Sequence, residues 1–207
     1  FPLSLEPERT ILIPTPFYSN QLEVIKNVAR SLPVDHLLYV KEHPMQKFRG
    51  LRPVSYYKEL SELQNVILIH PSTPNEKLVQ NCSLVVSILG TSSLEAAFRE
   101  KPSIVFGDVI FSSLPSVLRI QNLEELPELI KTGLNTKVNL SDLNKFVNMI
   151  EQNSFEYDEN EFAMNICDRF FFSGFLFDVN IPVSDMALFL EENKKIYDLL
   201  GSQHLKK

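Results

Sequence analysis

Two short motifs in this chain combine residue types that can bind a phosphate group. The first is Lys41-Glu42-His43-Pro44, which directly follows the apolar run Leu37–Val40. A lysine and a histidine at the end of a strand supply two hydrogen-bond donors to an anion, and a proline stiffens the turn that orients them. We therefore expect one side of an anion-binding site to consist of Lys41, Glu42, His43 and Pro44.

The second motif is Gly90-Thr91-Ser92-Ser93-Leu94-Glu95, which follows the run Ser83–Leu89 and opens a predicted helix. Gly90 allows an unusual backbone turn, the helix start offers unpaired N–H groups, and three consecutive hydroxyl side chains add donors. Glu95 lies one turn into the helix, where its carboxylate can accept hydrogen bonds from both hydroxyls of a ribose. The predicted ligand contacts of this motif are Gly90, Thr91, Ser92, Ser93 and Glu95.

Each motif also has a purely structural interpretation. Thr91 or Ser92 can be an N-cap, with Glu95 completing a capping box, and His43 can be a turn histidine that binds no ligand. What favours a ligand site is the position of the two motifs, because both follow strands of one predicted sheet. In open α/β sheets, ligands bind beyond the carboxyl ends of the strands.

A second histidine-proline pair, His70-Pro71, follows the run Val66–Ile69. Because Ser72-Thr73-Pro74 comes next, we interpret this pair as a turn before a helix that Thr73 caps. Gly107-Asp108 borders the pocket, where Asp108 could act as a general base or form a turn, and we favour the turn. Neither pair is included among the predicted ligand contacts.

The elements that must position these motifs alternate between short apolar runs and amphipathic stretches from residue 11 to about residue 121. This alternation is typical of βαβ units, and runs that are nearly continuous in Val, Ile and Leu indicate a sheet covered on both faces. We predict an α/β fold with a Rossmann-like doubly wound parallel sheet flanked by helices and a helical C-terminal extension. The predicted strands are Ile11–Pro14, Leu37–Lys41, Val66–Ile69, Leu84–Leu89, Ser103–Phe106 and Val117–Ile120. The predicted helices are Asn20–Leu32, Ser55–Leu63, Asn75–Gln80, Ser92–Glu100 and Leu123–Lys131.

The pattern changes after Gly133, so we divide the chain into a Rossmann-like lobe of residues 1–132, which holds both anion-binding motifs, and a mostly helical extension of residues 133–207. Within the extension, Leu140–Ile150 and Asp185–Leu200 have helical periodicity. We interpret the aromatic cluster Phe170–Phe177 as core or as an interface between lobes. The extension is expected to pack on the lobe, or on a second lobe that precedes Phe1.

Composition and charge exclude several classes of protein. The 207 residues are 44% hydrophobic and 22% charged, as in ordinary globular proteins, and 20 basic against 26 acidic residues give a net charge of −6. This balance argues against a nucleic-acid-binding protein, which needs a basic face. No run approaches the roughly 18 to 20 apolar residues that span a bilayer. Because Cys82 and Cys167 lie far apart, we expect reduced thiols and a cytoplasmic location.

The sequence lacks the motifs that bind metals, dinucleotides and nucleoside triphosphates. The four histidines are scattered, so no metal site is expected. Neither the dinucleotide motif Gly-x-Gly-x-x-Gly nor the Walker motif occurs, so no cofactor is expected either. A mononucleotide held by hydroxyls, a histidine and a helix start fits the two motifs better.

Several segments, taken together in their order and spacing, resemble the capsular or surface polysaccharide biosynthesis proteins of bacteria. The resemblance covers residues 1 to about 132 and implies a glycosyltransferase of the two-Rossmann-lobe (GT-B) kind, of which this chain would be the donor-binding C-terminal lobe. The segments are Phe1-Pro2-Leu3, Glu6-Pro7-Glu8, Leu32–Asp35, Tyr39–Pro44, Gly90–Ala96 and Lys101–Asp108.

The resemblance also implies roles for the site residues. In related bacterial sialyl- and Kdo-transferases, a His-Pro pair and a Ser/Thr pair bind the phosphate of a sugar activated by cytidine monophosphate (CMP). These pairs correspond to His43-Pro44 and to Thr91, Ser92 or Ser93, with His43 as the catalytic residue. A glutamate on the following helix holds the ribose, and this residue corresponds to Glu95.

Three hypotheses for function follow. The first is a glycosyltransferase lobe whose partners are a nucleotide-sugar donor and a glycan acceptor, with no nucleic acid, and with peripheral association at the inner face of the membrane through regions outside this chain. The second is a non-catalytic assembly module with a degenerate donor lobe. The third is an enzyme similar to the nucleotide-sugar epimerases, which share this lobe.

Overall fold

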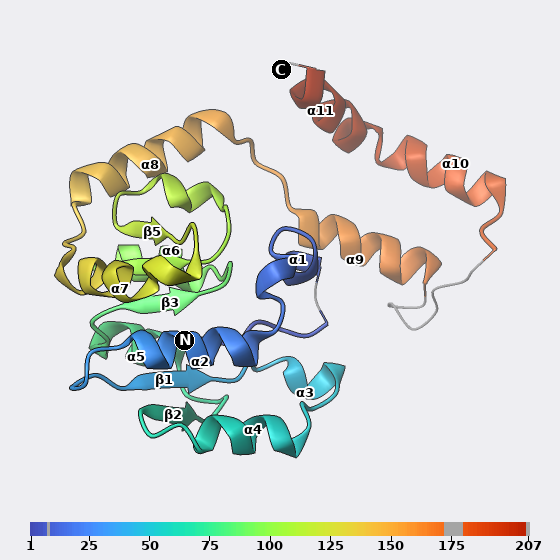
Figure 1. Ribbon diagram of the computed structural model, residues 1–207. Coiled ribbons are helices and arrows are strands. Elements are labelled where there is room, and N and C mark those ends of the chain that lie inside the picture. The colour runs from blue at the N-terminus through green and yellow to red at the C-terminus, as the bar shows by residue number, and fades with distance from the viewer. Residues whose placement is uncertain (8, 172–179, 206–207) are drawn as a thin grey trace. The chain divides into compact units, whose positions relative to one another are not determined.

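The computed structural model describes residues 1–7, 9–171 and 180–205, and the chain forms two compact units, Phe1–Asn153 and Ser154–Lys207. The first unit contains all the strands that are described. Strands β1 (Leu38–Lys41) and β2 (Val66–Ile69) pair in parallel, with Lys41 opposite Ile69. The other three strands form a second parallel sheet in the order β3-β4-β5, and Figure 1 draws strands as arrows. Those strands are β3 (Val85–Ser87), β4 (Ser103–Val105) and β5 (Val117–Arg119).

Helices cover both faces of the three-stranded sheet, as the continuous apolar runs predicted, whereas Tyr39 of β1 and Ile67 and Leu68 of β2 are exposed. Consecutive strand residues point to opposite faces, and in β4 Ile104 packs in one core cluster while Val105 packs in another. Figure 1 shows α4 beside β2 and α8 beside β5. The helices that share the core of Ile104 are α2 (Gln21–Ser31), α4 (Val54–Ser61) and α7 (Leu126–Asn135). Those that pack on the other face are α5 (Asn75–Asn81), α6 (Ser92–Phe98) and α8 (Leu140–Asn153). The predicted α/β class, with helices flanking parallel strands, is confirmed.

Helix α2 illustrates how the local sequence sets an element. Asn20 caps its first turn by accepting a hydrogen bond from the Glu23 N–H at 3.3 Å, and Pro33 follows its end. Its apolar face buries Ile25 and Val28 completely. Full burial of a side chain of this size stabilises the folded state by about 1.5 to 3 kcal/mol. The predicted helix Asn20–Leu32 is therefore confirmed to within one residue at each end.

The predicted strand Ile11–Pro14 is wrong, because residues Arg9–Leu12 form the short helix α1. The place beside β1 that this strand would take is occupied by Phe1-Pro2-Leu3. The Leu3 N–H donates to the Lys41 carbonyl at 2.8 Å, and the Lys41 N–H donates to the Phe1 carbonyl at 3.0 Å. One edge of a strand pairs with only one neighbour, so residues 11–14 cannot also pair with this edge of β1. Ile11 is buried as part of helix α1 instead. Pro14 lies beyond this helix, and Pro16 opens the 3-10 helix η1 (Pro16–Tyr18).

Three further short elements connect the larger ones. Helix α3 (Gln46–Arg49) follows β1 and was not predicted. The 3-10 helices η2 (Ile110–Ser113) and η3 (Leu123–Glu125) precede β5 and α7. The predicted helix Leu123–Lys131 thus corresponds to η3 and most of α7.

The first unit extends beyond the lobe of residues 1–132, because α8 belongs to its core. Leu143 and Phe146 of α8 are buried against Val105 and Val117 of the strands. An apolar face of this kind needs a partner surface, and β4 and β5 supply it. The functional division between a donor lobe and an extension stays a prediction.

The second unit consists of α9 (Glu159–Phe170), α10 (Val183–Glu192) and α11 (Lys194–Leu205). The single predicted helix Asp185–Leu200 is wrong, because Asn193 separates α10 from α11. The Asn193 side chain and its backbone N–H both donate to the Phe189 carbonyl, at 2.9 and 3.1 Å. Phe189 also contacts the rings of Phe162 and Phe170. Phe170 is thus a core residue here, whereas most of the predicted cluster Phe170–Phe177 lies outside the described residues.

Within the part of the chain that the structure describes, none of the helices has both the length and the apolar character needed to cross a membrane.

Candidate functional site

A line of polar side chains joins the two predicted motifs at the carboxyl ends of the strands. Lys41, the last residue of β1, donates from Nζ to Oδ1 of Asn75 at 3.2 Å. Asn75 donates in turn to Oε2 of Glu95 at 3.3 Å, and Oε1 of Glu95 accepts from the Thr91 hydroxyl at 3.5 Å. The structure therefore brings Lys41, Thr91 and Glu95 together, as the sequence predicted.

Asn75 is the member of this line that the sequence analysis missed as a site residue. It was predicted only as the first residue of a helix, and it does begin α5. The available signal was its position, since it is a polar residue at the helix start that follows β2. Only the contact with Lys41, 34 residues away, identifies its place in the site.

The electrostatics of this line centre on Lys41. Its side chain is buried, and this burial lowers the pKa of Lys41 below its ordinary value, while the nearby Glu95 carboxylate opposes the change. A partly desolvated ammonium group interacts more strongly with an anion than one in bulk water does. Lys41 is therefore a suitable donor to a negatively charged ligand.

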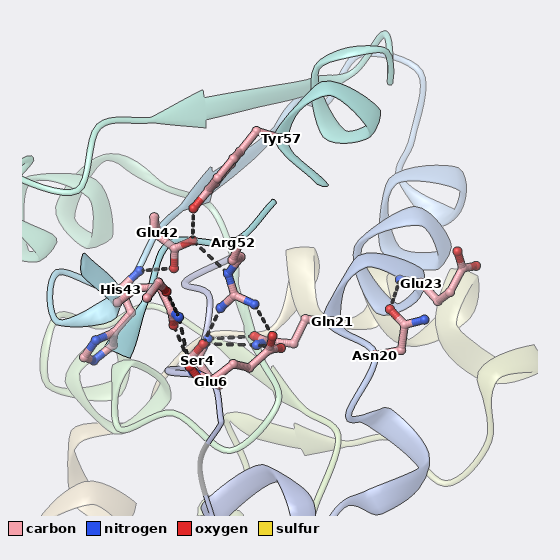
Figure 2. A network of polar contacts seen from close by, with 11 residues as sticks. Ser4, Glu6, Asn20, Gln21, Glu23, Glu42, His43, Arg52 and Tyr57 are labelled. Atoms are coloured by element: carbon pink, nitrogen blue, oxygen red, sulfur yellow. Dashed lines mark hydrogen bonds and ion pairs between the residues drawn. The ribbon is translucent and has the colours of Figure 1, made fainter. Parts of the chain in front are cut away.

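His43 stands in a turn that fixes its hydrogen-bonding state. The Gln46 N–H donates to the His43 carbonyl at 2.9 Å, and the Met45 N–H donates to Nδ1 of the imidazole at 3.2 Å. A backbone N–H can only donate, so Nδ1 accepts and a neutral imidazole carries its proton on Nε2. Figure 2 shows the ring directed away from the Arg52 side chain. His43 thus offers an Nε2–H donor, and Pro44 beside it is exposed.

Glu42, between Lys41 and His43, has a different environment. Its Oε1 accepts from the His43 N–H at 2.7 Å, and its Oε2 accepts from Nε of Arg52 and from the hydroxyl of Tyr57, both at 2.8 Å. Figure 2 shows these contacts as dashed lines. Both carboxylate oxygens are therefore used within the protein. Burial, together with the hydrogen bond to Glu42 and its charge, raises the pKa of Tyr57 to about 12.

Arg52 extends this network to the N-terminal segment. Its guanidinium contacts the Glu6 carboxylate through Nη1 and donates to the Ser4 carbonyl at 2.7 Å. Gln21 of α2 pairs with the backbone of Ser4, and Gln46 of α3 pairs with the backbone of Glu6. These contacts, which we call the Glu42–Arg52 network, tie the first residues, α2 and the loop after β1 to one another.

The Gly90–Ser93 segment differs in part from its predicted geometry. Gly90 does not adopt a positive φ, and a Cβ at this position would make an ordinary contact of 3.5 Å with Ser87, so the expected unusual turn is wrong. Ser93 is fully buried, and its hydroxyl shares a 2.9 Å hydrogen bond with Ser87. Thr91 is the N-cap of α6, but its side chain makes no capping hydrogen bond. The alternative of a capping box is therefore not what forms here, and Thr91 instead contacts Glu95.

A cavity of about 650 Å³ runs along the strands between β1 and β3 within the first unit. Lys41, Asn75 and Ser92 border it, together with the polar side chains of His36 and Lys77 and with apolar side chains from β1, α5 and β3. Lys41, Asn75 and Ser92 therefore connect this cavity to the strand ends, where we place the site. No group of metal-ligating side chains is found among residues 1–7, 9–171 and 180–205.

Comparison with known proteins gives one family. The model of a family described as capsule polysaccharide biosynthesis protein matches residues 1–125, which include both strand-end motifs. No curated protein and no solved structure matches the chain.

Proposed function

The chain belongs to the capsule polysaccharide biosynthesis family and thus has a role in capsule synthesis, and within that role we propose that it binds a nucleotide-sugar donor as one lobe of a glycosyltransferase. The observation that carries the proposal is the line from Lys41 through Asn75 to Glu95 and Thr91. It places a cation, a carboxylate and a hydroxyl together at the edge where parallel sheets bind ligands.

Each of these groups has a role that suits its chemistry. Lys41 and the Nε2–H of His43 bind the phosphate of the donor, because both are donors that the surrounding protein leaves available. Glu95 accepts from the ribose hydroxyls, and Thr91 and Ser92 add hydroxyl donors to the phosphate. We propose CMP as the nucleotide, in keeping with the His-Pro pair at the strand end.

The reaction breaks the bond between the anomeric carbon of the sugar and the phosphate oxygen, and the bonding electrons stay on the departing nucleotide. An acceptor hydroxyl forms the new glycosidic bond, and its proton passes to a base or to the solvent. Negative charge thus builds up on the phosphate, where Lys41 and His43 stabilise it. A preorganised donor of this kind contributes about 3 kcal/mol to such stabilisation.

The protein framework prepares His43 for this role. The Glu42 carboxylate accepts the His43 N–H, and Arg52 and Tyr57 fix that carboxylate in turn. Ser93 holds the second motif in place through the hydrogen bond between its hydroxyl and that of Ser87. We assign these residues to positioning, since their polar groups are already paired within the protein.

Calorimetric titration of CMP and UMP into the full chain tests the proposal. We expect binding of a cytidine nucleotide, weakened about tenfold by His43→Asn, which keeps an acceptor for the Met45 N–H but removes the Nε2–H donor. His204→Asn is the matched control, because His204 is exposed on α11 in the second unit and belongs to neither motif. Absence of binding for both nucleotides, or equal affinity of the His43→Asn variant, would contradict the proposal.

A non-catalytic assembly role is the second candidate, and a different observation favours it. Four large apolar side chains around α3 are exposed, with exposed fractions from 51% for Met45 to 82% for Val54. Phe48 and Leu51 lie between them in sequence, and Lys47 stands over the Phe48 ring. Such a surface suits a protein partner. A concentration-dependent oligomer in light scattering, together with no nucleotide binding, would support this role over the first.

A further inference from the structure

The turn after β2 has the same construction as the turn after β1. In the first turn, the Gln46 N–H donates to the His43 carbonyl at 2.9 Å, and in the second the Thr73 N–H donates to the His70 carbonyl at 3.0 Å. In both turns proline follows the histidine. The expected N-cap role of Thr73 is wrong, because Pro74 is the N-cap of α5 and no side chain caps that helix.

The two histidine side chains also make the same contact. The N–H of the residue two positions on, Met45 or Ser72, donates to Nδ1 of the imidazole at 3.2 Å in each case. The Ser72 hydroxyl adds a 2.7 Å contact to Nδ1 of His70. Because Nδ1 accepts from a backbone N–H, a neutral His70 carries its proton on Nε2, as His43 does. Each turn thus presents one imidazole donor that the turn itself does not use.

The register of the strands places these turns at the same edge. Lys41 of β1 lies opposite Ile69 of β2. His43 comes two residues after Lys41, and His70 comes one residue after Ile69. Neighbouring parallel strands are about 4.8 Å apart. The His70 turn leads directly into Asn75, whose amide links Lys41 to Glu95. His70 is exposed, so a ligand can reach its ring.

We propose that His70 is a second phosphate-binding histidine, whose Nε2–H donates to the same phosphate group as that of His43. This inference rests on the proposed function and adds a residue to its site. A turn that needs only a cap for its N–H is served by asparagine, aspartate or serine, which are the usual residues in such turns. A histidine in that place supplies the cap and also a second donor on the far side of the ring.

The test uses a substitution that separates these two properties. In His70→Asn the side-chain oxygen can still accept the Ser72 N–H, whereas the Nε2–H donor is lost. We expect the affinity for CMP, measured by calorimetry on the full chain, to fall about tenfold, and the midpoint of thermal unfolding to stay unchanged. The affinity for cytidine, which lacks the phosphate, should be the same in the variant and in the wild type. His204→Asn is again the control, with no change for either ligand.

The outcomes distinguish this inference from the proposed function. If the wild type binds CMP and His70→Asn binds it equally well, the inference about His70 is overturned and the proposed function stands. An equal loss of affinity for CMP and cytidine also overturns it, because His70 would then contact the nucleoside. If the wild type binds neither CMP nor UMP, both the proposed function and the inference about His70 are overturned.

Discussion

Lys41 and Glu42 are neighbours at the end of β1, yet they belong to two regions of opposite character. Glu42 lies in the Glu42–Arg52 network, where its carboxylate makes three hydrogen bonds of 2.7 to 2.8 Å. Lys41 lies in the line to Asn75, Glu95 and Thr91, where the contacts measure 3.2 to 3.5 Å. Hydrogen bonds weaken as they lengthen, so the first region is closed by its own contacts, and the second leaves capacity for a ligand.

The difference follows from the alternation of a strand. Successive side chains point to opposite faces, so adjacent residues meet different neighbours. On the side of Glu42 those neighbours are Arg52 and Tyr57, and on the side of Lys41 the neighbour is Asn75. We therefore expect substitutions in the Glu42–Arg52 network to lower stability, and substitutions in the line from Lys41 to Thr91 to weaken ligand binding.

The largest effect is expected for Arg52→Ala. The Arg52 and Glu42 side chains are only 3% and 9% exposed, so the variant leaves a buried carboxylate without its cation. Removing one partner of a buried ion pair costs about 3 to 5 kcal/mol of unfolding free energy. Urea unfolding followed by circular dichroism measures this loss. Arg49→Ala, at an exposed residue of α3, should change the unfolding free energy by less than about 1 kcal/mol. Equal stability of the two variants would contradict the structural role of Arg52.

A smaller effect is expected for Lys41→Met, which should weaken ligand binding and leave stability unchanged. The methionine keeps the length of the buried side chain and removes the ammonium group that faces the proposed phosphate. We expect the Kd for CMP to rise about tenfold, equivalent to about 1.4 kcal/mol, with no loss of unfolding free energy. Lys131→Met is the control, since Lys131 is exposed on α7 and pairs only with Glu128 among the contacts described. A loss of stability without a loss of affinity would place Lys41 in the structural region instead.

The smallest effect concerns Tyr57 and alkaline pH. Burial and the hydrogen bond to Glu42 raise its pKa from 10.0 to about 12, so the folded state holds the phenol proton more tightly than the unfolded state. The stabilisation is fully present below pH 10 and is lost as pH rises through about 12. Urea unfolding at a series of pH values should show this decline, and Tyr57→Phe should make it shallower. Part of the decline should persist, because burial also raises the pKa of Tyr56. An unchanged slope in Tyr57→Phe would contradict the contribution of Tyr57.

Much of the fold could be predicted from local sequence. The strand Val66–Ile69 and the cap of α2 at Asn20 follow from neighbouring residues, and both are confirmed. The run Ile11–Pro14 could not be interpreted correctly in this way, because its state depends on Phe1-Pro2-Leu3 occupying the edge of β1. Likewise, the helical periodicity of Asp185–Leu200 does not reveal that α10 ends and α11 begins at either side of Asn193.

The candidate site likewise has a part that the sequence predicts and a part that it does not. The sequence alone determined that Lys41 ends a strand and that His43, Thr91 and Glu95 follow strands, because strand ends can be recognised from apolar runs a few residues long. Only the tertiary structure decided that Asn75 links Lys41 to Glu95, and that Glu42 belongs to the network of Arg52. These contacts join residues 34, 20 and 10 positions apart. The direction of each side chain is set by the packing of several elements at once, and periodicity within one segment does not contain that information.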